Sequence, residues 1–537
     1  MTITEVSKPK RRNSSSNPFG EPDGQRSELA EDFVPFDRSS GWGDIATGES
    51  DSEARLLIGR KGSGKTLYMR RLRACASKAD SQYADDIDHR PPDTETILSF
   101  SRLFSEGESQ LEWWAKLWDR CVMRSLSSHL LVGVPSAQAD RKLTERLTHF
   151  TNSANGKLIR EFITPVSAYR QMEEIVSEHH NRNSLVAFLQ NPYWSDFEGV
   201  LAKALRTCPP IYLFLDALDE HFERSPRWWL KCQEGLFYYT IQSLRSDALN
   251  RLHLIVSLRD IVHASMMRSE HRSRFTGDSH IRMLNWHWYS IEEFLNVKLD
   301  RLNKHYFVNY VKGSRTIGNW LGSPEIVNLK RGIAEPALQY LLRHTRLLPR
   351  DIIIIGNKIC DAIERREIAN IDIQQEIRWE IHEAASMFGR EQFKICANEI
   401  LSTYMPRCAD ASCKNAYVGN DEYASTVANE LQDVVREIGK DRFSAEELDF
   451  IRDAANQKFD CDLFSLFWRN GLIGYVDGSH NSERFVFYNH DSLNSFQLPN
   501  NCREYVFHPI VIDATGIAAV GQIPVVPYAD GSRKFHA

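Results

Sequence analysis

Short apolar runs alternate with helical patterns over the first half of the chain. Three of these runs, at Arg55–Ile58, Ile211–Leu215 and Leu252–Leu258, are bounded by polar or helix-breaking residues and predict buried strands. Two shorter segments, Thr96–Phe100 and Ile281–Leu284, predict further strands. Strands that are apolar throughout and are separated by helices are typical of a parallel sheet covered on both faces. We therefore predict an α/β core.

Helical periodicity dominates most of the remaining chain. Residues 66–79 and Gln110–Leu131 predict two helices, and residues 140–205 form a mostly helical insertion between the early and central strands. Residues 290–437 are again mostly helical and contain no internal repeat. We expect the helices after residue 290 to form a unit of their own beside the sheet.

The last hundred residues follow a different pattern. Ser444 and Glu447 form a predicted capping box that opens one helix, and Leu463–Leu472 predicts a second, short helix. Short predicted strands follow it at Gly474–Asp477, Arg484–Tyr488 and Glu504–His508. Two helices followed by short strands are the pattern of a winged helix.

Residues 1–30 are rich in Ser, Pro, Lys and Arg and poor in apolar side chains. A segment of this composition buries too little surface to offset its ordering entropy. We therefore predict a disordered N-terminal tail.

The overall composition is that of an ordinary globular protein. Apolar residues make up 42% and charged residues 26% of the 537 residues, and the formal net charge of −6 gives no general attraction to nucleic acid or anionic membranes. We find no membrane-spanning apolar stretch and no secretory signal, and the ten cysteines are scattered. We therefore expect a cytoplasmic protein with reduced thiols and no membrane contact.

The first predicted strand runs into a glycine-rich loop, Gly59-Arg60-Lys61-Gly62-Ser63-Gly64-Lys65-Thr66. This string fits G-x-x-x-x-G-K-[ST] at every fixed position and stands between a predicted strand and a predicted helix. Glycines let backbone N–H groups turn toward phosphate oxygens, and the helix N-terminus adds partial positive charge. We expect Lys65 to reach the β- and γ-phosphates of a nucleotide and Thr66 to bind Mg²⁺.

The central strand Ile211–Leu215 ends in Asp216. A strand that ends in Asp is a weak signal alone, but beside a phosphate loop it matches the Walker B strand that accompanies a Walker A loop. Asp216 is then expected to hold Mg²⁺ through water. ATP and Mg²⁺ are the predicted ligands.

The residues after Asp216 carry a family resemblance. Typical AAA+ ATPases have Glu directly after this Asp, whereas here Ala217-Leu218-Asp219-Glu220 follows. This string resembles the STAND ATPases, in which a small residue follows the Asp and an acidic pair comes later. The resemblance implies that Asp219 or Glu220 orients the attacking water; an acidic helix cap is the alternative.

The phosphate loop, read with Asp32-Phe33-Val34, is also similar to bacterial P-loop ATPases of STAND-like or AAA+-like type. That resemblance covers about residues 30–290 and extends more loosely to Pro349-Arg350-Asp351 and to a strand end at His508-Pro509. The long insertion between the two Walker motifs departs from compact STAND proteins. The resemblance implies a fold and an ATPase activity, and it implies little about the substrate.

Several arginines acquire expected roles from the resemblance. Arg259, at the end of the Leu252–Leu258 run, is expected to sense the γ-phosphate, because guanidinium binds phosphate oxygens bidentately. Thr345–Asp351 resembles the Pro-containing sensor segment of a helical lid, in which Arg350 is the preferred nucleotide contact and Arg346 the second choice. Three further arginines are alternative arginine fingers for an oligomer: Arg268, Arg272 and Arg274.

The predicted fold is α/β, with a P-loop NTPase parallel-sheet core followed by a helical lid and a C-terminal winged-helix-like domain. The expected boundaries are 1–30 for the tail, 31–290 for the ATPase domain with its insertion at about 140–205, 291–440 for the lid, and 441–537 for the last domain. The resemblance implies an ATP-hydrolysing switch that couples nucleotide state to domain packing or oligomerisation, in bacterial stress or phage defence. We expect a homo-oligomer or a protein partner.

The alternative is a DNA-transaction ATPase of initiator or loader type with a DNA-binding winged helix. Residues 441–537 contain eight Lys and Arg against thirteen Asp and Glu, so their net charge is 8 − 13 = −5. A DNA-reading module normally has a basic face. The candidate recognition helix carries only Arg469 as a cation, among large apolar residues. DNA is therefore not the favoured partner.

Overall fold

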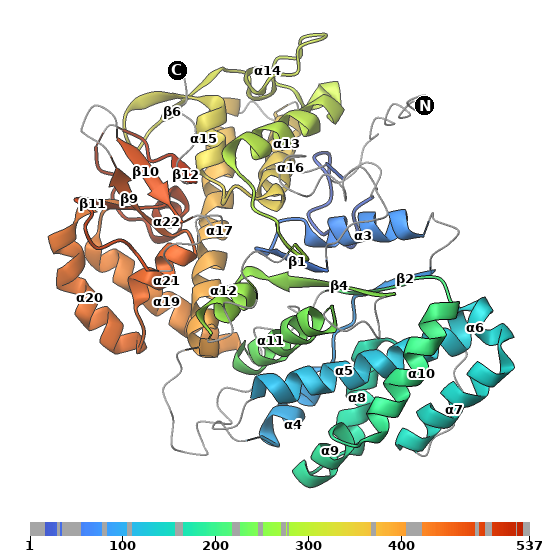
Figure 1. The fold of residues 1–537 in the computed structure, drawn as a ribbon. Coiled ribbons are helices and arrows are strands. Elements are labelled where there is room, and N and C mark those ends of the chain that lie inside the picture. Colours follow the sequence, from blue (N-terminus) through green and yellow to red (C-terminus); the bar gives the residue numbers. More distant parts are fainter. Residues whose placement is uncertain are drawn as a thin grey trace.

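The protein is described here by a computed structural model that covers residues 17–28, 33–34, 55–77, 83–104, 110–155, 165–216, 226–244, 251–269, 275, 279–366, 372–403, 421–477, 483–488, 497–521 and 523–529. A five-stranded sheet lies at its centre, with strand order β2-β3-β4-β1-β5 and every pair of neighbours parallel (Figure 1). The strands are β1 (Leu56–Gly59), β2 (Tyr83–Asp88), β3 (Ile211–Leu215), β4 (Leu252–Arg259) and β5 (Ile281–Met283).

Both faces of the three inner strands of this sheet are buried, and alternate residues of these strands enter different cores. Leu57 of β1 and Ile255 of β4 belong to the core that contains helix α3 (Lys65–Ala76). Their neighbours Ile58 and Val256 belong to the core on the opposite face. This alternation follows from the two-residue period of a strand, and it confirms the predicted α/β fold with a parallel sheet.

One predicted strand is wrong. Thr96–Phe100 lies within helix α4 (Thr94–Arg102), because the side chain of Asp93 caps the helix by accepting a hydrogen bond from the Thr96 backbone N–H (2.7 Å). The edge strand of the sheet is instead β2, whose sequence YADDID is acidic and largely half-buried. A polar edge strand lacks the apolar run that marks a buried one.

Helices of the segment between β2 and β3 cover the face opposite α3, together with the helices that follow β3 and β4 (Figure 1). The helical insertion expected at 140–205 is present in the described residues. The elements are α4, α5 (Gln110–Ser128) with a π-helical end (His129–Gly133), α6 (Pro135–Ala139), α7 (Arg141–Asn155), α8 (Ala168–Glu178), α9 (Arg182–Leu189), α10 (Tyr193–Thr207), α11 (Pro226–Ser243) and α12 (Asp260–Arg268).

The chain between β5 and β8 (Arg442–Ser444) forms a mainly helical region. We use the word lid below as a name for this region, whose action as a lid stays a prediction. Its longest helix, α17, packs against α11 of the sheet region and against helices of the lid and the C-terminal part (Figure 1). The elements are α13 (Trp288–Arg301), a 3₁₀ turn (Lys304–Tyr306), α14 (Ile317–Leu321), β6 (Glu325–Asn328), β7 (Ile333–Pro336), α15 (Ala337–Arg343), α16 (Pro349–Arg365), α17 (Ile373–Thr403) and α19 (Asp421–Ile438).

The C-terminal module contains a second five-stranded sheet, in the order β12-β10-β9-β11-β8. Ser444 and Glu447 form the predicted capping box, with both reciprocal hydrogen bonds present. All seven residues of α21, the candidate recognition helix, are buried. The elements are β8 (Arg442–Ser444), α20 (Ala445–Phe459), α21 (Leu463–Arg469), β9 (Ile473–Asp477), β10 (Arg484–Phe487), β11 (Glu504–Phe507), α22 (Pro509–Thr515) and β12 (Pro527–Ala529).

Residues 17–28 correct the prediction of a disordered tail over residues 1–30, whereas residues 1–16, 29 and 30 lie outside the described part of the chain. The Phe19 side chain is 2% exposed and stacks on Trp320 of the lid, with ring centroids 4.9 Å apart. The Phe19 backbone N–H donates to Asn357 Oδ1 (2.8 Å), and Asn357 Nδ2 donates to the main-chain oxygen of Gly20 (3.0 Å). Gly356 leaves room for the ring, since a Cβ there would lie 2.3 Å from it. One aromatic anchor therefore orders a segment whose average composition is that of a tail.

We predict that Phe19→Ala lowers the free energy of unfolding by about 3 kcal/mol, the usual cost of emptying a buried aromatic site. Thermal and denaturant unfolding of the full chain measure this loss. Arg26→Ala is the matched control, because the Arg26 side chain is 80% exposed and its removal should cost less than about 0.5 kcal/mol. Equal losses in the two variants would contradict the anchoring role.

Candidate functional site

The glycine-rich loop lies where β1 ends and α3 begins. Gly62 and Gly64 have φ angles of +89° and +97°, a region that favours glycine, and Gly64 is the N-cap of α3. The Ser63 backbone N–H donates to the Arg60 oxygen (3.1 Å), which tightens the turn. The loop is therefore wound around the N-terminus of a twelve-residue helix, where backbone N–H groups lack helical partners and favour an anion.

Lys65 and Thr66 form the first turn of α3 and face different partners. The Lys65 ammonium reaches back across the loop and donates to the main-chain oxygens of Gly59 (2.9 Å) and Arg60 (3.1 Å). The Thr66 hydroxyl donates to Asp216 Oδ2 at 2.8 Å. The fold thus brings together the two residues that sequence analysis assigned to a metal ion, although they lie 150 positions apart.

Asp216 stands in a row of polar side chains at the carboxyl edge of the sheet. Strand register pairs Asp88 with Leu215 and Leu215 with Val256, so the next residue on each of the three strands lies side by side. These residues are His89, Asp216 and Ser257. His89 Nδ1 lies 3.3 Å from Asp216 Oδ2, and the Ser257 hydroxyl donates to Asp216 Oδ1.

The Asp216 carboxylate is almost completely buried, at 2% exposure. Burial by itself raises its pKa, but the neighbouring His89 ring and the hydrogen bonds from Ser257 and Thr66 outweigh this effect and hold the pKa below its usual value. The backbone of Asp216 is held on both sides. Its N–H donates to the main-chain oxygen of Asp88 (3.0 Å), and the Tyr169 hydroxyl donates to the main-chain oxygen of Asp216 (2.9 Å). The site is a rigid, ionised carboxylate beside a hydroxyl.

These donors fit the ligands expected from the sequence. The Thr66 hydroxyl and the Asp216 carboxylate are oxygen ligands of the kind that Mg²⁺ prefers. The Ser63 hydroxyl, inside the loop, is buried and has no hydrogen-bond partner within the described part of the chain. A buried polar atom without a partner costs free energy, so this hydroxyl is a strained feature of the loop, packed against Gly59.

The lid contacts the loop through α16 and α17. The Arg350 backbone N–H donates to the Gly62 oxygen (3.3 Å). Glu391 of α17 lies 3.5 Å from the Lys61 ammonium, 3.0 Å from Arg346 and 3.9 Å from Arg350. Burial raises the pKa of Glu391, but Arg346, Lys61 and Arg350 together lower it below its usual value. An ionised carboxylate therefore joins loop cations to lid cations.

The two lid arginines differ in their surroundings. Arg346 is buried and is held by Asp351 through Nε (3.0 Å) and Nη2 (2.7 Å), so it is engaged within the lid. Arg350 is 35% exposed at its side chain and stands beside Gly62, where a Cβ would lie 3.0 Å from the Arg350 Cβ. The placement favours Arg350 over Arg346 as a loop-side cation.

The C-terminal module also contacts the loop. Arg60 lies 3.7 Å from Asp260 of α12, and its guanidinium donates to the Arg469 main-chain oxygen at the end of α21 (3.5 Å). The Arg469 side chain itself is buried against Glu399 of α17 (3.0 Å). Arg60 and Lys61, which occupy positions that the loop motif leaves unspecified, therefore face the module and the lid.

Two of the remaining predicted residues, Arg259 and Arg268, lie in the described part of the chain. Arg259 ends β4 beside Gly59 of β1 and is 6% exposed, and Arg268 lies 3.6 Å from Glu399. Four residues lie outside the described part of the chain, and their expected roles stay predictions: Asp219, Glu220, Arg272 and Arg274.

Sequence reasoning missed His89, Ser257 and Glu391. His89 was missed because the acidic strand β2 before it was not recognised. Ser257 had a usable signal: it is a polar residue within an apolar run, near the end where parallel strands carry functional groups. Glu391 had none, since its role arises from the packing of α17 against the loop.

None of the helices in the described part of the chain is both long enough and apolar enough to cross a membrane. No protein-family model matches this chain, and no curated protein is similar to it at a significant level.

Proposed function

We propose that this chain binds and hydrolyses Mg²⁺-ATP and acts as a P-loop switch of STAND-like or AAA+-like type. The observation that carries the proposal is the contact between the Thr66 hydroxyl and Asp216 (2.8 Å), beside a loop wound around the N-terminus of α3. This arrangement places the backbone N–H groups of a helix N-terminus, one ammonium and two oxygen ligands at one edge of a parallel sheet. These are the groups that a triphosphate and its metal need.

Each residue of the site has a proposed task. Loop N–H groups and the Lys65 ammonium bind phosphate oxygens, and Thr66 and Asp216 hold Mg²⁺, which when bound neutralises phosphate charge. Ser257 and His89 keep the Asp216 carboxylate oriented. Asp219 or Glu220 orients the attacking water, and Arg259 and Arg350 are the proposed phosphate-sensing cations.

The switch proposal is supported by two side chains of the loop that contact other regions of the protein. Lys61 contacts Glu391 of the lid, and Arg60 contacts the end of α21 in the module. The lid and the module share one continuous hydrophobic core with the α3 face of the sheet. A bound phosphate would attract Lys61 and Arg350 and so compete with Glu391 for these two cations. Loss of their contacts with Glu391 would change how the lid packs. The regions proposed as lid and winged-helix-like domain are the parts that report nucleotide state.

The packing of the C-terminal module supports a switch over the DNA-transaction alternative. Its candidate recognition helix α21 is buried over all seven residues, and its cation Arg469 pairs with Glu399. A helix that reads DNA must present side chains to a groove. We propose a protein partner or a second copy of the chain as the reader of the switch.

We predict that Lys65→Ala lowers ATP affinity at least about tenfold and abolishes turnover, because the phosphates lose their central cation. Binding of a fluorescent ATP analogue and release of phosphate measure the two effects. Glu220→Gln separates them, since it should slow hydrolysis and leave binding intact. Turnover retained in Lys65→Ala would remove the ATPase assignment.

We predict that Glu391→Gln tightens ATP binding about tenfold, or ~1.4 kcal/mol. The carboxylate holds Lys61 and Arg350 in competition with the phosphates, so its loss frees two cations for the anion. Titrations at low and high salt measure the change, which should shrink as ions screen it. The matched control is Glu145→Gln, whose carboxylate is 62% exposed and pairs with Arg141 on α7. Unchanged or weaker binding in Glu391→Gln would contradict the competition.

A further inference from the structure

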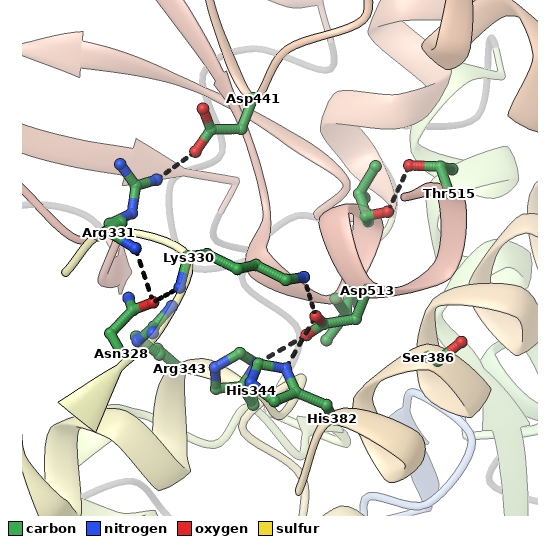
Figure 2. A network of polar contacts seen from close by, with 12 residues as sticks. Asn328, Lys330, Arg331, Arg343, His344, His382, Ser386, Asp441, Asp513 and Thr515 are labelled. Carbon is green, nitrogen blue, oxygen red and sulfur yellow. Dashed lines mark hydrogen bonds and ion pairs between the residues drawn. The ribbon is translucent and has the colours of Figure 1, made fainter. Parts of the chain in front are cut away.

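Two histidines and an aspartate meet where the lid joins the C-terminal module (Figure 2). His344 follows α15, His382 lies on α17 and Asp513 lies on α22. His344 Nδ1 is 2.8 Å from Asp513 Oδ2, and His382 Nδ1 is 2.9 Å from Asp513 Oδ1. The three ligand atoms of this cluster all lie within 4.8 Å of one another. They converge on one point although they come from three separate helical segments.

The cluster is largely shielded from water. The side chains of His344 and Asp513 are each 3% exposed, and that of His382 is 30% exposed. The cluster is therefore open to solvent only on the side of His382, from which an ion and a water ligand can enter.

An outer partner orients His382. The Tyr340 hydroxyl lies 2.7 Å from His382 Nε2, and the Tyr340 side chain is fully buried. This contact turns Nδ1 of His382 toward Asp513. Histidines that bind metals usually have their second ring nitrogen hydrogen-bonded in this way.

One cation competes for the same carboxylate. The Lys330 ammonium donates to Asp513 Oδ1 (2.7 Å), as Figure 2 shows. The Lys330 side chain is 45% exposed, so it can move into solvent when another cation takes its place. The neighbouring Arg343 is engaged elsewhere, because its Nε lies 2.9 Å from Glu335 Oε2.

We propose that His344, His382 and Asp513 form a site for one divalent transition-metal ion, with Zn²⁺ as the best match. Two imidazole nitrogens and one carboxylate oxygen are a ligand set that suits Zn²⁺, with water as the fourth ligand, whereas Mg²⁺ and Ca²⁺ prefer oxygen throughout. With Nδ1 of His382 on the ion, the ring proton lies on Nε2, and this N–H donates a hydrogen bond to the Tyr340 hydroxyl oxygen. The ion ties the lid to the module and does not rely on nucleotide binding.

The test is calorimetric titration of ZnCl₂ into the full chain after treatment with a chelator, without nucleotide. We expect one equivalent to bind at micromolar concentration or below, and Co²⁺ to give the visible absorption of a tetrahedral site. His382→Ala should lose both signals and still fold, because this side chain is partly exposed. His305→Ala, an exposed histidine in the lid, should keep them. Absence of stoichiometric binding, or equal binding in His382→Ala and the unaltered chain, would overturn the proposal.

Two further variants separate a metal site from a hydrogen-bonded contact between the lid and the module. Tyr340→Phe should weaken Zn²⁺ binding about 10- to 100-fold, the usual effect of losing an outer partner. Lys330→Ala should strengthen it, because the competing ammonium is gone. A cluster that only hydrogen-bonds would show no Zn²⁺ affinity to change in either variant, and that result also overturns the proposal. Lys65→Ala should bind Zn²⁺ normally, so failure of the ATPase proposal would leave this one standing.

Discussion

The charge on Asp216 must be stabilised where almost no water reaches it, and the candidate site is organised around that requirement. An ionised carboxylate is costly to bury unless hydrogen bonds or cations replace its solvent. Here three side chains do so: Thr66 from α3, His89 after β2 and Ser257 from β4. They come from elements far apart in the sequence, and the parallel sheet aligns them at one edge. Strand register thus sets the geometry of the site.

The glycine-rich loop (residues 59–66) faces the sheet edge, and it also faces the lid and the C-terminal module. Its fixed glycines shape the backbone, whereas its variable residues Arg60 and Lys61 contact the module and the lid. Glu391 and Glu399, which lie eight positions apart on α17, pair with cations of the loop, the lid and the module. Helix α17 therefore contacts the loop, the lid and the module, while Arg60 of the loop also contacts the module directly.

The extent to which the sequence predicted the structure differs between segments for physical reasons. Buried strands such as Ile211–Leu215 were recognised because parallel strands covered on both faces are apolar throughout. The edge strand β2 was missed, since half-buried acidic residues carry no such signal. Residues 17–28 were assigned to a disordered tail from average composition, which gives no weight to a single Phe19 that fills a buried site.

The sequence by itself determined the local chemistry: the glycine-rich loop, the helix that follows it, the apolar strand that ends in Asp216, and the capping box at Ser444. Each depends on residues within one turn, strand or helix, so spacing alone reveals it. Only the tertiary structure decided which side chains meet, as with Ser257 and Asp216, Glu391 and Lys61, or His344 and Asp513. Such contacts depend on strand register and helix packing, which arise from the burial of the whole apolar surface and are not encoded in any short stretch of the chain.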